Sequence, residues 1–288
     1  MKPLKGIVYS FIGGIANVKA ENNQMISCKP LGIFKFKNKN NSIICGDKVL
    51  LEFNEGVYQI TRVFDRKNEL IRPKVANSDA VLIIQSVIEP NLNKTLLNKF
   101  LMFYEYYIDN VWIAFSKSDL LLEQEYNEFL KIKNDFASCG YQVFDLNNQK
   151  EFNELLNRFN NKLICLVGNS GVGKSTFLNK INPNLLLRVQ EISKSLNRGK
   201  HTTTNVGIID FDNYSIIDTP GFSSLDLNLT KEEIAIGWKE FREYTPKCKY
   251  SNCLHLSEPN CEIKNMLKSG KILEFRYIDY CYFLKNAK

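Results

Sequence analysis

The residues best suited to chemistry form one run in the middle of the chain. The run reads Gly168-Asn169-Ser170-Gly171-Val172-Gly173-Lys174-Ser175, with Thr176 after it. Small residues let backbone N–H groups approach and wrap a polyphosphate. Lys174 can then reach the β- and γ-phosphate oxygens as a catalytic residue, and the Ser175 hydroxyl can bind Mg²⁺. The run therefore predicts a nucleoside triphosphate site rather than a chance glycine-rich turn.

A second segment, further along the chain, could complete a magnesium and phosphate site. The apolar residues Ile216 and Ile217 lead into Asp218-Thr219-Pro220-Gly221. The Asp218 carboxylate can hold Mg²⁺ through water, and the Gly221 N–H can meet a γ-phosphate. Alone, Asp-x-x-Gly is a weak signal. After a phosphate loop it is a strong one, because two strands of one parallel sheet deliver their ligands to the same crevice.

A third segment, ahead of the phosphate loop, predicts which base is bound. The apolar run 111–115 ends in Ser116-Lys117-Ser118-Asp119, which resembles the guanine-reading Asn-Lys-x-Asp motif of GTPases. Asp119 would accept two hydrogen bonds from guanine, a donor pair that adenine lacks, while the aliphatic stem of Lys117 covers the base. Ser116 stands where Asn is usual, so the contact that ties this loop to the phosphate loop is shortened. A lone Lys-x-Asp is usually only a solvated strand end.

The order of the three segments is unusual. In an ordinary GTPase domain the base reader follows the phosphate loop and Asp-x-x-Gly, whereas here it precedes both. A circular permutation explains this order. Termini that lie close together on a compact domain can be joined and the chain reopened elsewhere, and the same strands then assemble the same sheet.

With this motif order the chain resembles the RsgA family, circularly permuted GTPases that depend on the small ribosomal subunit. The resemblance spans nearly the whole chain and includes Gly6-Ile7-Val8, Gly46-Asp47-Lys48-Val49, Arg72-Pro73, Ala76-Asn77, Arg198-Gly199-Lys200-His201-Thr202-Thr203-Thr204 and the cysteine cluster near the end. It implies late maturation of the small subunit, with departure of the factor after GTP hydrolysis. Besides Ser116, the chain departs from the family in its short N-terminus and near residues 144–147, where the usual Ser-Ala cannot be placed.

The elements that must position these residues suggest three domains. Residues 1–72 contain short predicted strands at 6–9, 33–36, 47–53 and 56–63. Closely spaced strands predict a small barrel, and the resemblance implies an OB-fold. Such barrels bind RNA with aromatic and cationic side chains, here Phe34, Lys35, Phe36, Lys37 and Lys39. Alternating phenylalanines more often form one buried sheet face, so the lysines are the better candidates for phosphate contact.

Residues 73–225 hold the nucleotide motifs. The apolar run 80–85 predicts a buried strand, and the pattern over 94–107 predicts an amphipathic helix. Strands that alternate with helices indicate an α/β domain with a parallel sheet and ligands at its carboxyl edge.

Residues 226–288 contain a cluster of potential metal ligands. Its members are Cys248, Cys253, His255 and Cys261. Three thiolates and one imidazole favour a closed tetrahedral Zn²⁺ site, which stabilises a small, mostly helical domain that has little core of its own. The alternative is a set of unrelated buried or redox thiols. Pro246, Pro259 and polar neighbours place the cluster in loops and favour zinc.

The sequence is least informative about the attacking water. Ras-like proteins place a Gln soon after Asp-x-x-Gly, whereas this chain has Phe222, which cannot accept a proton. Intrinsic hydrolysis should therefore be slow until a partner arranges the site. His201 is the best candidate to order the water. It could instead form a hydrogen bond within the nucleotide-dependent switch segment that contains it, or contact rRNA. Thr202 or Thr203 should bind Mg²⁺ when GTP is present.

Composition bounds the partners and the compartment. Residues 1–72 carry 12 Lys/Arg against 6 Asp/Glu within a 288-residue chain of net charge +7. This excess suits RNA phosphate, although Lys and Asn are abundant throughout. No apolar stretch is long enough to cross a bilayer, and the N-terminal apolar run is too short and too broken by glycine for a signal peptide. Scattered cysteines agree with a cytoplasmic location, and the protein is expected to be a monomer.

Two other functions remain open. The chain could be an RNA-binding scaffold in which GTP is structural and hydrolysis incidental. It could also be a metabolic kinase, but the base reader and the lack of an evident acceptor pocket argue against one.

Overall fold

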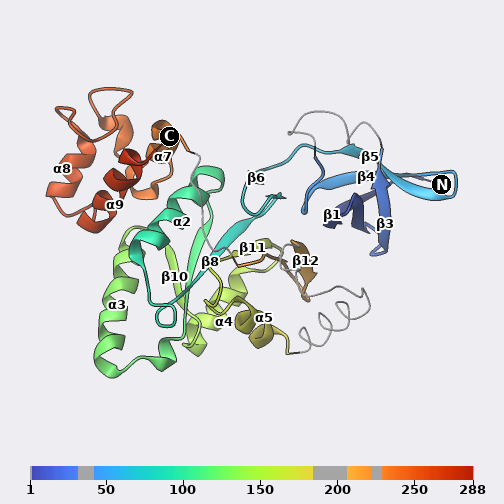
Figure 1. Ribbon diagram of the computed structural model, residues 1–288, viewed down its shortest axis with the longest axis horizontal. Coiled ribbons are helices and arrows are strands. Elements are labelled where there is room, and N and C mark those ends of the chain that lie inside the picture. The colour runs from blue at the N-terminus through green and yellow to red at the C-terminus, as the bar shows by residue number, and fades with distance from the viewer. Residues whose placement is uncertain (1, 32–41, 184–205, 222–228, 288) are drawn as a thin grey trace. The chain divides into compact units, whose positions relative to one another are not determined.

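The computed structural model describes residues 2–31, 42–183, 206–221 and 229–287 (Figure 1). The chain folds into two compact units. The first comprises Met1–Ala80, Leu156–Val167 and Leu178–Gly221, and the second comprises Val81–Leu155, Gly168–Phe177 and Phe222–Lys288. None of the helices in the described ranges combines the length and apolar character that a bilayer crossing requires.

The first unit contains a closed five-stranded barrel of order β1-β2-β3-β5-β4, drawn in blue in Figure 1. Its strands are β1 (Leu4–Ile12), β2 (Ile15–Ala20), β3 (Met25–Pro30), β4 (Lys48–Asn54) and β5 (Val57–Val63). β1 pairs antiparallel with both β2 and β4, and β3 pairs in parallel with β5, which closes the barrel. Alternate side chains such as Val49 and Leu51 are fully buried. The predicted OB-fold barrel is confirmed.

Sequence patterns located only some of these strands. The expected strands near 6–9, 47–53 and 56–63 correspond to β1, β4 and β5. β2 and β3 were not expected, because their alternation is short and interrupted by polar residues. The strand expected at 33–36, with the candidate RNA contacts Phe34, Lys35, Phe36, Lys37 and Lys39, lies outside the described residues.

The turn before β4 depends on a glycine and a buried carboxylate. Gly46 has φ +89°, and a Cβ there would lie 2.0 Å from the carbonyl oxygen of Ala76. The fully buried Asp47 accepts a hydrogen bond from the Ile44 N–H at 2.8 Å and pairs with the Arg66 guanidinium at 2.7 Å. Without these donors, burial of the charged Asp47 carboxylate would cost free energy. The close approach at Gly46 and the hydrogen bonds of Asp47 together account for the Gly-Asp sequence at this turn.

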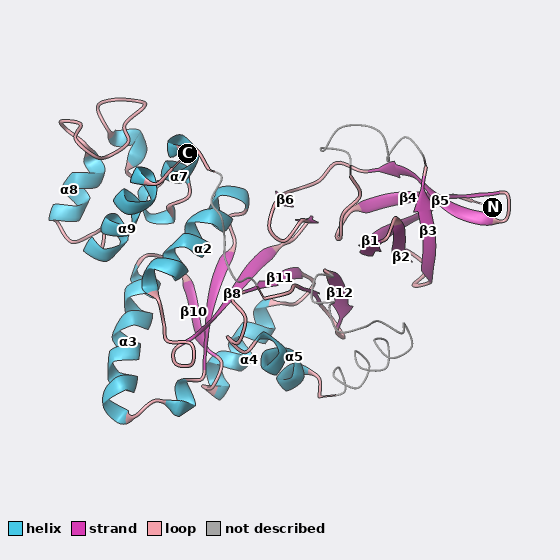
Figure 2. Ribbon diagram, viewed as in Figure 1, coloured by secondary structure: helices cyan, strands magenta, loops and turns pink. Residues whose placement is uncertain are grey.

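A six-stranded sheet of order β10-β9-β8-β11-β13-β12 carries the nucleotide motifs (Figure 2). Its strands are β8 (Ala80–Ser86), β9 (Val111–Ser116), β10 (Gln142–Asp145), β11 (Leu163–Val167), β12 (Gly207–Asp210) and β13 (Ser215–Asp218). β9 is parallel to both β8 and β10, and β11 is parallel to β13, whereas β12 pairs antiparallel with β13. Every residue of β8 and β9 is buried, as in strands covered on both faces.

Helices join these strands. They are α2 (Lys94–Tyr107), α3 (Glu123–Ser138), α4 (Gln149–Arg158) and α5 (Lys174–Ile181). The bounds predicted for α2 are confirmed. The Asn93 side chain accepts a hydrogen bond from the Leu96 N–H at 2.9 Å and caps its first turn, and the buried Leu97, Leu101 and Tyr104 recur at helical spacing along one face.

The C-terminal segment is helical, as predicted, with α7 (Lys231–Ile236), α8 (Glu262–Lys268) and α9 (Glu274–Lys285) joined by short 3₁₀ turns. Its core holds the fully buried Arg276, which stacks over Trp238 at 4.3 Å. Arg276 donates to both Glu240 carboxylate oxygens at 2.6 and 2.9 Å and to Asn98 of α2 at 2.6 Å. Removing one partner of such a buried pair costs about 3–5 kcal/mol. This network anchors the segment within the second unit.

Candidate active site and metal centre

The phosphate loop lies between the end of β11 and the start of α5. Gly168 has φ +150°, and a Cβ at this position would lie 2.4 Å from the carbonyl oxygen of Ile84. Gly173 has φ +94° in the turn that enters the helix. Any other residue would be strained in such a conformation. The glycines therefore give the loop the close backbone turn that the sequence predicts for phosphate wrapping.

Lys174 is held against the loop that it follows. Its side chain is mostly buried, and its ammonium donates to the carbonyl oxygens of Gly168 at 2.7 Å and Asn169 at 2.9 Å. Both contacts keep the charge at the mouth of the phosphate loop. An ammonium there can transfer its hydrogen bonds to phosphate oxygens, which are stronger acceptors than carbonyls.

Ser116, at the end of β9, joins the base reader to the phosphate loop. Its buried hydroxyl donates to the carbonyl oxygen of Val172 at 2.6 Å. The Ser116 Oγ also lies 3.5 Å from the position that a Cβ on Gly173 would occupy, so the two segments are in close contact. The short serine side chain thus reaches the phosphate loop directly, although an asparagine is usual at this position.

We expect Ser116→Ala to lower GTP affinity roughly ten-fold, because it removes a buried donor from the Val172 carbonyl. Titration with a fluorescent GTP analogue would measure this loss. Ser138→Ala is the matched control, since the Ser138 hydroxyl also donates to a backbone carbonyl but at an exposed position. Equal affinities for Ser116→Ala and the control would contradict a role for this contact.

The base reader itself has one constrained and one exposed residue. Lys117 adopts φ +64°, and its ammonium donates to the carbonyl oxygen of Glu89. Asp119 lies in the 3₁₀ turn Ser118–Leu120, with its side chain exposed. An exposed carboxylate at the carboxyl end of a strand can accept hydrogen bonds from a base, as predicted for guanine.

A second loop lies beside the base reader. β10 ends at Asp145, which is opposite Phe115 of β9 in the parallel pairing. The Ser118 hydroxyl donates to the buried Asp145 carboxylate at 2.7 Å. Sequence reasoning could not assign this loop because it contains no Ser-Ala pair. An acidic residue at the end of a short apolar strand was the signal that could have found it.

The Asp-x-x-Gly segment follows β13. Asp218 is the last residue of this strand, which runs parallel to β11, and the two strands end at the same edge of the sheet. The Thr219 hydroxyl donates to the Leu166 carbonyl at 2.6 Å and fixes the turn after the strand. Gly221 is exposed just beyond. His201, Thr202 and Thr203 lie outside the described residues.

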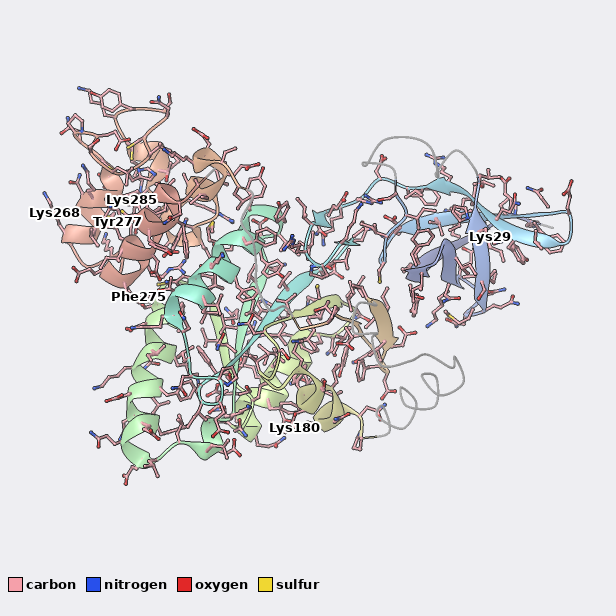
Figure 3. All side chains as sticks on the ribbon, viewed as in Figure 1. Lys29, Lys180, Lys268, Phe275, Tyr277 and Lys285 are labelled. Carbon is pink, nitrogen blue, oxygen red and sulfur yellow. The ribbon has the colours of Figure 1, made fainter. Side chains whose placement is uncertain are left out.

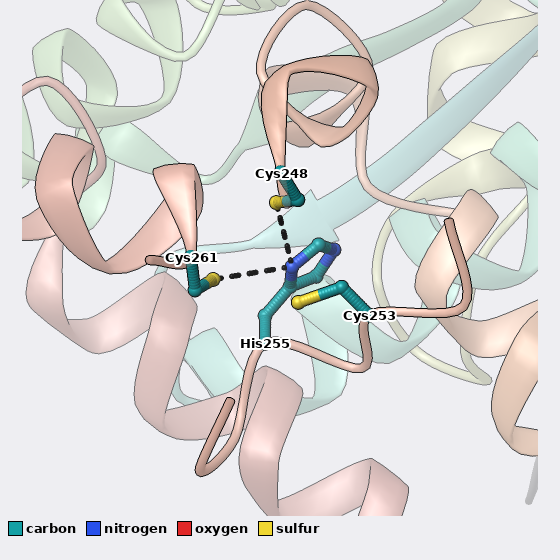
Figure 4. A group of neighbouring side chains, drawn as sticks. All are labelled: Cys248, Cys253, His255 and Cys261. Carbon is teal, nitrogen blue, oxygen red and sulfur yellow. Dashed lines mark hydrogen bonds between the residues drawn. The ribbon is translucent and has the colours of Figure 1, made fainter. Parts of the chain in front are cut away.

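The four predicted metal ligands converge in the C-terminal segment (Figure 4). The ligand atoms of Cys248, Cys253, His255 and Cys261 all lie within 4.8 Å of one another. The His255 Nδ1 is 3.6 Å from the Cys248 Sγ and 3.4 Å from the Cys261 Sγ. Three thiolates and one imidazole nitrogen, gathered in this way, are a donor set that fits a tetrahedral metal ion.

Neighbouring groups orient these ligands. The other ring nitrogen of His255, Nε2, lies 3.3 Å from the Thr245 hydroxyl, which leaves Nδ1 to face the thiols. The Glu262 N–H points to the Cys248 Sγ at 3.4 Å. Tyr277 of α9 is labelled in Figure 3. Its hydroxyl donates to the His255 carbonyl oxygen at 2.6 Å. Such partners fix ligand orientation at metal centres and supply donors to thiolate sulfur.

Burial gives the ligands protonation states that a cation would change. It raises the pKa of the Cys253 thiol to about 12, and it lowers the pKa of the His255 imidazole. The neutral imidazole is the form that binds metal. A bound divalent cation would deprotonate the thiols, because it is a larger local charge than any side chain nearby. The donor chemistry therefore fits a metal ion.

A phosphate loop, a run that resembles a guanine reader and is hydrogen-bonded to that loop, and an Asp-x-x-Gly strand end are the features of a P-loop GTPase whose motifs are circularly permuted. Residues 63–228 match the family model described as RsgA GTPase. A protein named small ribosomal subunit biogenesis GTPase RsgA from Ureaplasma urealyticum serovar 10 is 43% identical over 281 residues, covering 97% of this chain and 92% of its own length. The chain belongs to the RsgA GTPase family.

Further relatives agree along nearly the whole chain. A protein of the same name from Staphylococcus aureus is 41% identical over 282 residues, covering 96% of this chain and 94% of its own length. The crystal structure of YloQ, a circularly permuted GTPase, superposes with a TM-score of 0.79 at 29% identity, covering 99% of this chain and 95% of that chain. The crystal structure of YjeQ from Thermotoga maritima superposes with a TM-score of 0.81 at 30% identity, covering 99% of this chain and 98% of that chain.

Proposed function

We propose that this GTPase binds the small ribosomal subunit during its late maturation, hydrolyses GTP to GDP under stimulation by the subunit and then departs. The relatives carry the words small ribosomal subunit biogenesis in their names. The observation that carries the nucleotide part of the proposal is the Ser116 to Val172 hydrogen bond. It joins the base reader to the phosphate loop, although the two are distant in sequence.

The nucleotide roles are assigned to particular residues. The base and phosphates would be held by Ser116, Lys117, Ser118, Asp119, Gly168, Asn169, Ser170, Gly171, Val172, Gly173, Lys174, Ser175, Thr176 and Gly221. Mg²⁺ would be held by Ser175, Asp218, Thr202 and Thr203, and would neutralise the charge of the phosphates. Lys174 is the residue that stabilises the charge developing on the γ-phosphoryl group.

Cys248, Cys253, His255 and Cys261 would hold one structural zinc ion. A closed Cys₃His set leaves no coordination position for substrate, so the metal contributes folding free energy rather than catalysis. The proposed domains are an OB-fold over 1–72, the GTPase domain over 73–225 and the zinc domain over 226–288. The protein would act as a cytoplasmic monomer whose basic first domain contacts rRNA.

Isolated small subunits provide the test of this function. We expect many-fold faster phosphate release from GTP in their presence, together with co-sedimentation that is stronger with a non-hydrolysable GTP analogue than with GDP. After hydrolysis, the switch segment that contains His201 would lose its contacts with the γ-phosphate, and the protein would bind RNA less tightly. Binding without any stimulation would instead support the scaffold, in which GTP is structural.

We expect Asp119→Asn to shift nucleotide preference from GTP toward xanthosine triphosphate. A carboxylate accepts from the guanine N1–H and 2-amino groups, whereas an amide can accept from N1–H and donate to the xanthine 2-carbonyl. Loss of charged hydrogen bonds should cost GTP roughly 10²-fold in affinity. Competition titrations would measure the exchange, with the exposed Asp212→Asn as control. Retention of full GTP preference would argue against guanine reading by Asp119.

We expect His201→Ala to lower subunit-stimulated turnover by about 10²-fold while GTP affinity stays within a few-fold, if this imidazole orders the attacking water. Phosphate release with saturating small subunits would measure turnover, and titration would measure affinity. Stimulated turnover equal to that of the unaltered protein would remove the role from His201.

A further inference from the structure

The buried carboxylate of Asp145 lies beside the base reader but belongs to none of the predicted motifs. Its side chain is only 2% exposed, and its partner Ser118 is only 4% exposed. Asp145 ends β10 and Phe115 lies opposite it in β9. Because parallel strands end at the same edge of a sheet, the carboxylate lies next to the run 116–119 that follows β9.

One oxygen of Asp145 fixes two loops at once. Its Oδ1 accepts from the Ser118 hydroxyl at 2.7 Å and from the Asn147 N–H at 2.9 Å. Hydrogen bonds to an ionised carboxylate are roughly twice as strong as those between neutral groups. Ser118 immediately precedes Asp119, so the first of these bonds restrains the backbone that carries the base-reading carboxylate.

Asp145 is itself held from two sides. Its backbone N–H donates to the Glu151 carboxylate in the first turn of α4 at 2.7 Å, and the same carboxylate pairs with Lys133 of α3. The next residue, Leu146, donates its N–H to the Phe115 carbonyl oxygen at 2.8 Å. A residue restrained at its backbone on both sides can hold another group in place with little loss of entropy.

We propose that Asp145 is a positioning residue for guanine selection, acting through Ser118 to set the place of the Asp119 carboxylate. The inference rests on the proposed reading of guanine by Asp119. In this proposal Asp145 is not itself a guanine ligand, because its carboxylate is buried and its Oδ1 already accepts from two protein donors. It lies in the segment where the usual Ser-Ala pair cannot be placed, and it links the base reader to the loop after β10.

Paired substitutions test the inference by nucleotide preference. We expect Asp145→Ala and Ser118→Ala each to lower GTP affinity roughly ten-fold while ATP affinity stays constant, so that the GTP to ATP ratio falls by the same factor. The double variant should lose no more GTP affinity than the weaker-binding single variant, because both substitutions remove the same Ser118–Asp145 hydrogen bond. Asp145→Asn, whose amide oxygen still accepts from Ser118, should retain most of the preference. The KM for GTP should rise more than kcat falls.

A hydroxyl–carboxylate pair elsewhere in the same unit supplies the matched control. The Thr95 hydroxyl donates to Asp279 at 2.9 Å, so Thr95→Val removes the same kind of bond and should leave the GTP to ATP ratio unchanged. Equal losses of GTP and ATP affinity in Asp145→Ala, or additive losses in the double variant, would overturn the positioning role. An unaltered protein that binds ATP as well as GTP would instead overturn the proposed guanine reading.

Discussion

We expect replacement of Lys174 by alanine to lower GTP hydrolysis by roughly 10²–10³-fold, with and without the small subunit. The ammonium at the mouth of the phosphate loop is the charge best placed to follow the γ-phosphoryl group as its negative charge spreads in the transition state. Loss of one such preorganised donor costs roughly 10²–10³-fold in turnover. Phosphate release from GTP would measure the effect.

Lys150→Ala is the control for this result, because Lys150 is an exposed lysine in the first turn of α4. This variant loses one positive charge, as Lys174→Ala does, but its phosphate loop is unaltered. The turnover of Lys150→Ala should therefore match that of the unaltered protein. Undiminished hydrolysis by Lys174→Ala would remove the assignment of the phosphate loop as the hydrolytic site.

We expect replacement of Cys261 by serine to remove the proposed zinc ion and to destabilise the C-terminal segment. Four ligands from one short stretch would hold this segment around the proposed metal, and a serine hydroxyl is a far weaker ligand for zinc than a thiolate. We expect bound zinc to fall from about one ion per chain to near zero, with a melting temperature lower by roughly 10 °C. Elemental analysis and thermal unfolding would measure the two effects.

Cys281→Ser separates the metal from a general effect of losing a thiol. Cys281 is a half-buried free cysteine on α9, outside the cluster, so the variant should keep its zinc. A chelator should reproduce the effect of Cys261→Ser on the unaltered protein. Protein that is purified without chelator and contains no stoichiometric zinc would contradict the metal assignment.

Elements with strong local patterns were predictable. The helix α2 follows from its apolar spacing and its Asn93 cap, and β8 and β9 follow from short continuous apolar runs whose length suits a buried strand. β2 and β3 were missed because their short alternation competes with turns. Their pairing within the barrel stabilises them, and that is a long-range effect.

The sequence alone was enough to predict the chemistry of this protein. The phosphate loop, Asp-x-x-Gly and the Cys₃His cluster are each contiguous or nearly so, and their residue types and spacing are those that phosphate and metal binding require. Their permuted order was likewise readable without any structure.

Only the tertiary structure decided how the base reader is held. The contacts of Ser116 with Val172 and of Ser118 with Asp145 join segments that are far apart in the chain. Local propensity carries no information about such pairs, because strand order and register bring them together. The sequence predicted a shortened contact at Ser116, and close packing against the phosphate loop gives its short hydroxyl a direct hydrogen bond.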